Sequence, residues 1–230
     1  MKRINMKILF CGDLHGNWGA LNNIINKKQP DIVLQCGDFG WWPQWEVTHP
    51  VLYGRQSVWT HKGLKPGNTK VYFCDGNHEQ HPTLNQDGEI HELYKNIFFC
   101  PRGSILQLED LKILFVGGAA SIDKDKRTPG HDWFPEEMLN IKQCDRILSH
   151  QDIDMVISHT CPESFNIQGS DGKMNDSTRL VLDKVLMTYN PDLWVFGHWH
   201  KFQLGHYKET NWFCLDYPSH GSQWWMEIRL

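Results

Sequence analysis

The stretch KILFCGDLHG, residues 7–16, joins a short apolar run to two chemically active side chains. The run KILFC is bounded by turn residues, which is typical of a buried strand. Asp13 and His15 follow at once, each beside a glycine. Glycine allows backbone and solvent to approach closely, and ligand sites in α/β sheets assemble at the carboxyl ends of strands. The stretch therefore predicts a strand that leads directly into a functional site.

Similar apolar runs recur along the chain and predict further strands. They lie at residues 31–37, 70–76, 96–100, 105–110, 112–118, 154–159 and 193–198, and three more close the chain at 203–207, 211–216 and 224–229. Helical patterns lie at Trp18–Lys28, from 135 to about 143, and at Ser177–Tyr189. Strands outnumber helices but alternate with them several times, which favours an α/β layered fold. Because no repeat or linker interrupts the chain, residues 1–230 are predicted to form a single domain.

Side chains that ligate metals stand at the ends of five of these strands. In chain order they are Asp13, His15, Asp38, Asn77, His159, His198 and His200. Oxygen and imidazole donors without thiolate suit Mn, Fe or Zn better than Ca or Mg, which take oxygen almost exclusively. Residues two apart in an extended segment face the same way, so Asp13 and His15 are expected to share a face, as are His198 and His200. Seven ligands are too many for one tetrahedral ion and indicate two ions about 3.5–4 Å apart that share a carboxylate.

Five motifs carry these residues in the order GDLHG, GDFG, GNHE, SHTC and GHWH. In this order they resemble the calcineurin-like metallophosphoesterase family, to which the serine/threonine protein phosphatases are related, over roughly residues 7–200. Small bacterial and phage-encoded members are similar around residues 117–137. The resemblance implies a four-layer α/β sandwich of two packed mixed β-sheets flanked by helices. It also implies one metal held by Asp13, His15, Asp38 and His200, and a second held by Asp38, Asn77, His159 and His198, with Asp38 bridging.

The resemblance further implies a metal-dependent hydrolase. A hydroxide shared by the two metals would attack a phosphomonoester or phosphodiester. His78, next to the ligand Asn77, is expected to protonate the leaving oxygen or to stabilise it. Its alternative role is a hydrogen bond that supports a ligand. Alternative functions are a nuclease or cyclic-nucleotide phosphodiesterase, and a catalytically weak metal-binding scaffold, although the intact ligand positions argue against the scaffold.

One motif differs from the corresponding motif of the protein phosphatases. They carry GDxxDRG where this chain has GDFGWWP, so Trp41 and Trp42 stand in place of the acid and the neighbouring Arg. Arg127, just before the turn residues 128–130, is the candidate to grip phosphate, because a guanidinium offers a bidentate fork. The alternative is a solvated Arg in a charged loop. The run WWPQW at 41–45 either lines the pocket or packs a loop.

Composition limits the classes of partner. The chain has 23 Lys and Arg against 27 Asp and Glu, with no block of like charges, so there is no strong nucleic-acid signal. No apolar run suffices for a signal peptide or a membrane span, so we expect a cytoplasmic protein without a membrane partner. Seven cysteines without a CxxC motif are expected to be reduced thiols. The expected partners are two divalent ions and a phosphorylated small molecule, nucleotide or phosphoprotein.

Overall fold

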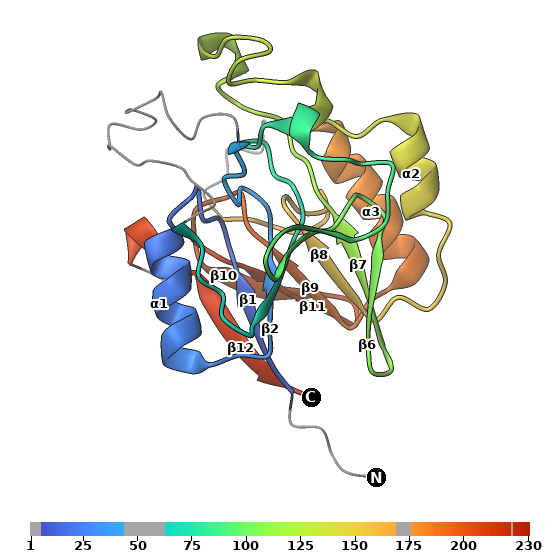
Figure 1. The fold of residues 1–230 in the computed structure, drawn as a ribbon. Helices are drawn as coiled ribbons and strands as arrows, with labels where there is room; N and C mark the ends of the chain where they lie inside the picture. Colours follow the sequence, from blue (N-terminus) through green and yellow to red (C-terminus); the bar gives the residue numbers. More distant parts are fainter. Residues whose placement is uncertain (1–5, 44–62, 169–175, 222) are drawn as a thin grey trace.

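The computed structural model describes residues 6–43, 63–168, 176–221 and 223–230, which form two six-stranded sheets packed face to face (Figure 1). In spatial order, the first sheet contains β12 (Trp225–Arg229), β1 (Lys7–Cys11), β2 (Ile32–Gln35), β3 (Lys70–Phe73), β5 (Ile97–Phe99) and β4 (His91–Tyr94). The second sheet contains β10 (Gln203–Tyr207), β11 (Thr210–Cys214), β9 (Leu193–Phe196), β8 (Met155–Ser158), β7 (Leu111–Val116) and β6 (Ile105–Leu108).

Both sheets have four parallel strands in the middle and an antiparallel strand at each edge. In the first sheet β1, β2, β3 and β5 are parallel, and β12 and β4 run antiparallel to them. In the second sheet β11, β9, β8 and β7 are parallel, and β10 and β6 are antiparallel. The central strands β2 and β8 are buried along their whole length, as expected for parallel strands covered on both faces. This arrangement brings the carboxyl ends of neighbouring strands together.

Helices cover the outer face of each sheet. The helix α1 (Trp18–Lys28) packs Leu21, Ile24 and Ile25 against the first sheet. The helices α2 (Ile141–Ile147) and α3 (Ser177–Tyr189) pack against the second sheet. A third apolar cluster lies between the sheets and joins strands of both. The predicted four-layer α/β sandwich is confirmed.

One local prediction was wrong, and one strand was not predicted. The helix predicted from 135 to about 143 is instead a single 3₁₀ turn, Pro135–Glu137, followed by extended backbone. The helix α2 begins only at Ile141, because Asn140 and Gln143 form a capping box in which each side chain accepts the other's backbone N–H. The strand β4, with the sequence HELY, was not predicted, because it is polar and only partly buried and so lacks an apolar run.

All seven cysteines are free thiols, and six of them are buried. Among the described residues, no helix is both long enough and apolar enough to cross a membrane.

Candidate metal centre

Each predicted ligand lies in a loop just beyond the carboxyl end of a parallel strand. The strands are β1 for Asp13 and His15, β2 for Asp38, β3 for Asn77, β8 for His159, and β9 for His198 and His200. These loops are not extended, since φ is 45° at His15, 49° at Asp38, 68° at His198 and 50° at His200. Residues other than glycine rarely adopt this left-handed backbone conformation. Those that do are concentrated at functional sites. The expectation of an extended backbone was therefore wrong, and of the two pairs only Asp13 and His15 still face one point.

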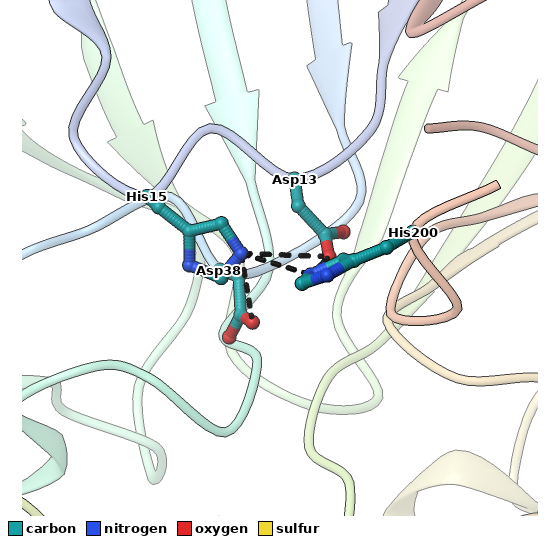
Figure 2. Close-up of side chains that lie close together, drawn as sticks. All are labelled: Asp13, His15, Asp38 and His200. Atoms are coloured by element: carbon teal, nitrogen blue, oxygen red, sulfur yellow. Dashed lines mark hydrogen bonds and ion pairs between the residues drawn. The ribbon is translucent and has the colours of Figure 1, made fainter. Parts of the chain in front are cut away.

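Four side chains from three loops converge on one point, as Figure 2 shows. They are Asp13, His15, Asp38 and His200, and one potential ligand atom from each lies within 4.8 Å of the others. His15 Nε2 and His200 Nε2 are 3.0 Å apart. His200 Nε2 lies 3.0 Å from Asp13 Oδ2, and His15 Nε2 lies 3.8 Å from Asp38 Oδ2. We call these four residues the first ligand group.

The remaining predicted ligands form a second group on the other side of Asp38. Asn77 Oδ1 lies 3.0 Å from His159 Nε2 and 3.1 Å from His198 Nδ1. His159 Nε2 is also 3.4 Å from Asp38 Oδ1. Asp38 therefore presents one carboxylate oxygen to each group. His198 and His200, although two residues apart, belong to different groups.

The side chains present fit divalent cations. Both carboxylates are buried, with Asp13 0% and Asp38 1% exposed, and buried negative charge requires a positive partner. Asp13 Oδ2 faces two imidazoles, with His200 Nε2 at 3.0 Å and His15 Nε2 at 3.8 Å. His159 Nδ1 donates to the Cys36 carbonyl at 2.8 Å, which turns Nε2 toward the site, as is usual for imidazole ligands.

The electrostatics of the centre favour positive charge between the two carboxylates. Burial alone would lower the pKa of His159, but Asp38 and then Asp13 raise that pKa to about 10. Burial would raise the pKa of Asp38, but His159 and His78 hold it well below its usual range. The pKa of His198 is lowered to about 3, by burial and then by the charge on His159. In the absence of a cation, a proton on His159 thus offsets the negative charge of Asp38 and Asp13.

Glycines allow the carboxylates to approach the neighbouring loops. A Cβ on Gly197 would overlap Asp13 Oδ1, which accepts the backbone N–H of His198 at 2.9 Å. A Cβ on Gly76 would overlap Asp38 Oδ1 in the same way. The glycines of GHWH and GNHE are therefore required by close packing between loops.

The structure places Arg127 against His78. Arg127 Nη2 lies 2.8 Å from His78 Nε2 and 2.7 Å from Asp123 Oδ1, and Nη1 donates to the Asn77 carbonyl at 3.4 Å. The Arg127 side chain is only 8% exposed, so it does not extend into solvent. Because a guanidinium only donates, His78 Nε2 accepts this hydrogen bond. Burial, aided by the charge of Arg127, holds the pKa of His78 well below its usual range.

The two tryptophans of GDFGWWP are packing residues. Trp41 and Trp42 are each 6% exposed, and Trp42 Nε1 donates to the His78 carbonyl at 2.8 Å. Trp42 thereby supports the loop that carries His78. Trp45, the third tryptophan of the WWPQW run, lies outside the described residues.

Glu79 is a structural residue of the centre that the sequence analysis missed. Its carboxylate accepts the backbone N–H of Gly40 at 2.9 Å and that of Gly76 at 2.5 Å, which joins the loops after β2 and β3. Burial and the charge of Asp38 raise the pKa of Glu79 to about 8, although both hydrogen bonds oppose this shift. Glu79 is the last residue of the GNHE motif, and this position was the signal from which its role could have been predicted.

Comparisons with known proteins agree with this architecture. The family model described as calcineurin-like phosphoesterase matches residues 6–202. No curated protein matches the chain. One solved crystal structure is 13% identical with a TM-score of 0.58, covering 98% of this chain and 95% of the other, and at this identity the likeness shows the fold alone.

Two further solved structures are similar to this chain. GAP50, the anchor in the inner membrane complex of Plasmodium, is 12% identical with a TM-score of 0.48, covering 92% of this chain and 71% of the other. A conserved uncharacterized protein of Streptococcus pneumoniae, a predicted phosphoesterase, is 14% identical with a TM-score of 0.39, covering 98% and 84%. Because the family model spans most of the chain and every ligand loop, this protein belongs to the calcineurin-like phosphoesterase family.

Proposed function

We propose that the protein is a metal-dependent phosphoesterase that hydrolyses a phosphomonoester or a phosphodiester with two divalent cations. The observation that carries this proposal is the position of Asp38, whose two oxygens face two separate ligand groups. Bound there, two divalent cations would lower the pKa of water toward neutrality and offset negative charge on the phosphoryl oxygens. The donor set favours Mn, Fe or Zn.

The ligands would divide between the cations as the two groups do. One cation would be held by Asp13, His15, Asp38 and His200, and the other by Asp38, Asn77, His159 and His198. Each cation then has at least one carboxylate and two imidazoles, together with carboxylate or amide oxygen, and Asp38 is common to both.

His78 and Arg127 would act on the substrate rather than on the metals. His78 supplies a proton to the leaving oxygen or stabilises it, and Arg127 donates to the non-bridging phosphoryl oxygens. Both roles are supported by position, since His78 Nε2 lies 4.0 Å from Asp38 Oδ2 and 2.8 Å from Arg127 Nη2. His78 Nε2 accepts from Arg127 in this contact, so His78 acts as an acid only after Arg127 has turned to the phosphoryl group and Nε2 has gained a proton. Arg127 thus stands in for the Arg of the GDxxDRG motif that this chain lacks.

The test is hydrolysis of p-nitrophenyl phosphate and bis-p-nitrophenyl phosphate before and after chelation, followed by return of Mn²⁺. We expect activity on at least one ester, its loss on chelation and its recovery with Mn²⁺. Full activity of the metal-free protein would contradict the proposal. Faster cleavage of the diester would favour a nuclease or cyclic-nucleotide phosphodiesterase, and bound metal without turnover of either ester would favour a scaffold.

A further inference from the structure

Among the seven predicted ligands, Asn77 alone carries a side-chain amide. An amide can turn either its oxygen or its NH₂ group toward a site, and only the oxygen binds a cation. Asn77 Oδ1 faces His159 and His198, whereas Nδ2 donates to Ser121 Oγ at 3.0 Å on the opposite side. Whatever holds the amide in this orientation therefore decides whether the second ligand group can bind a cation.

The hydrogen bonds of Ser121 determine which way the amide faces. Ser121 Oγ donates to Glu137 Oε2 at 2.6 Å, and the Ser121 backbone N–H donates to Glu137 Oε1 at 2.8 Å. An ionised carboxylate only accepts, so the hydroxyl proton points to Glu137 and leaves the hydroxyl oxygen as an acceptor toward Asn77. A flipped Asn77 would place its oxygen against that acceptor, without a proton between them.

The three side chains are shielded from water that could replace these bonds. Asn77 is 6%, Ser121 5% and Glu137 2% exposed. The turn that carries Glu137 is itself anchored, because the fully buried Arg102 donates from Nη2 to the Glu136 and Glu137 carbonyls at 2.9 and 3.0 Å. The direction of the hydrogen bonds from Asn77 through Ser121 to Glu137 is therefore fixed by the anchored turn that carries Glu137.

We propose that Ser121 and Glu137 are positioning residues that hold the Asn77 amide with its oxygen toward the second cation. The proposal rests on the two-cation centre of the proposed function. It gives a role in that function to two more residues of the segment 117–137, in which Arg127 was the only candidate predicted from sequence. Neither Ser121 nor Glu137 contributes a ligand of its own to either group.

The decisive variant is Glu137→Gln, which keeps the shape of the side chain and reverses the hydrogen-bond polarity. The new NH₂ group would donate to Ser121 Oγ, so the Ser121 proton would turn toward Asn77 and draw the amide oxygen away from the centre. Ser121→Ala removes the link, and Ser121→Thr retains a hydroxyl as its matched control. Asp176→Asn is a second control, because Asp176 binds the same segment through the Ala120 N–H without contacting Asn77.

The measurement is Mn²⁺ binding to metal-free protein by equilibrium dialysis, with the electron paramagnetic resonance spectrum of the bound Mn²⁺. We expect two Mn²⁺ per chain and a spin-coupled spectrum in the wild type, Ser121→Thr and Asp176→Asn. In Glu137→Gln and Ser121→Ala we expect the second Mn²⁺ to bind about 10–100-fold more weakly, on the scale of lost support to a metal ligand. The first Mn²⁺ should bind normally and give the spectrum of an isolated ion.

The outcomes separate this proposal from the proposed function. Wild-type affinity for the second Mn²⁺ in Ser121→Ala and Glu137→Gln would overturn the positioning role alone. An equal loss in Asp176→Asn would also overturn it, because the effect would then belong to the whole segment. A wild type that binds fewer than two Mn²⁺ would overturn the two-cation function and this proposal together. Circular dichroism checks folding, and if Glu137→Gln unfolds, Ser121→Ala against Ser121→Thr carries the comparison.

Discussion

At the scale of single residues, the ligands are held in strained backbone conformations by hydrogen bonds between loops. A non-glycine residue in a sparsely populated conformation costs of order 1–3 kcal/mol and persists where its surroundings determine it. The backbone N–H groups of Leu14 and His15 both donate to the Asp38 carbonyl, at 3.0 and 2.8 Å. The loops after β1 and β2 therefore position each other's ligands before any cation binds.

Replacing His78 by Asn should affect substrates according to their leaving groups. A general acid contributes about 10²–10⁴-fold to rate, and its loss matters most when the leaving oxygen is basic. His78→Asn should therefore slow hydrolysis of an alkyl phosphate much more than that of p-nitrophenyl phosphate, with metal content unchanged. Steady-state kinetics on both esters checks this, and equal losses would point to a supporting role for His78.

Replacing Arg127 by Lys should weaken phosphate binding while retaining the charge. The ammonium group cannot form the bidentate pair that a guanidinium forms with phosphoryl oxygens. Arg127→Lys should raise KM for a phosphomonoester and weaken inhibition by inorganic phosphate, both measured by steady-state kinetics. Lys126→Ala, at an exposed position in the same loop, is the matched control and should change neither. Unchanged KM and inhibition in both Arg127→Lys and Arg127→Ala would remove Arg127 from the site.

At the scale of elements, the segment between β7 and α2 completes the centre from outside the ligand strands. It supplies Arg127 to His78 and Ser121 to Asn77, and it lies beyond the carboxyl ends of the strands (Figure 1). Arg102 ties this segment to the end of β3, since it pairs with Asp75 and donates from Nη1 to the Met138 carbonyl at 2.9 Å. The buried Arg102 side chain thus joins the end of β3 in the first sheet to the segment between β7 and α2.

Removing Arg102 should destabilise the fold strongly. Arg102→Ala leaves the buried Asp75 carboxylate without its partner, which costs about 3–5 kcal/mol. Lys112→Ala is the control, because its ion pair with Asp152 is exposed and such pairs contribute about 0–1 kcal/mol. Urea unfolding followed by circular dichroism gives both free energies of unfolding. A loss for Arg102→Ala no larger than that for Lys112→Ala would show that the pair does not hold the segment.

At the scale of the whole molecule, the centre lies where the two sheets meet. Asp13, Asp38 and Asn77 follow strands of the first sheet, whereas the His159, His198 and His200 loops follow strands of the second. Each proposed cation therefore takes ligands from both sheets. Cation binding should stabilise the packing of one sheet on the other, because the ligands come together only in the folded state.

Mn²⁺ should accordingly raise the melting temperature of the metal-free protein. A ligand at 100 times its Kd stabilises the folded state by about 2.7 kcal/mol. Asp38→Asn should lose most of this stabilisation, because Asp38 serves both cations, and its activity should fall at least about 100-fold. Asp152→Asn, at an exposed carboxylate, should behave like the wild type. Differential scanning calorimetry checks the shift, and no shift with Mn²⁺ would contradict a centre shared by the sheets.

Elements whose signals are local could be predicted from the amino-acid sequence. Apolar runs bounded by turn residues predicted every strand of the described structure except the polar β4. Helical patterns predicted α1 and α3, the latter with a cap at Asp176 or Ser177. The start of α2 was missed, although Asn140 and Gln143 carried a capping-box signal. Motif order, through the resemblance, predicted two groups of ligands. The side chains of each predicted group lie close together in the structure, and their role as ligands stays a prediction.

Contacts between segments that lie far apart in the chain could not be predicted in this way. The resemblance assigned His198 and His200 to different metals, and the structure supplies the physical reason. Their left-handed backbones turn the side chains apart, which a spacing of two residues does not reveal. Arg127 meets His78 across 49 residues of chain, and Ser121 meets Asn77 across 44. Such contacts depend on how the two sheets and the segment between β7 and α2 pack against one another. Local propensity carries no information about that packing. Ser121 and Glu137 therefore emerged only with the fold, whereas Arg127 and His78 were candidates from the sequence.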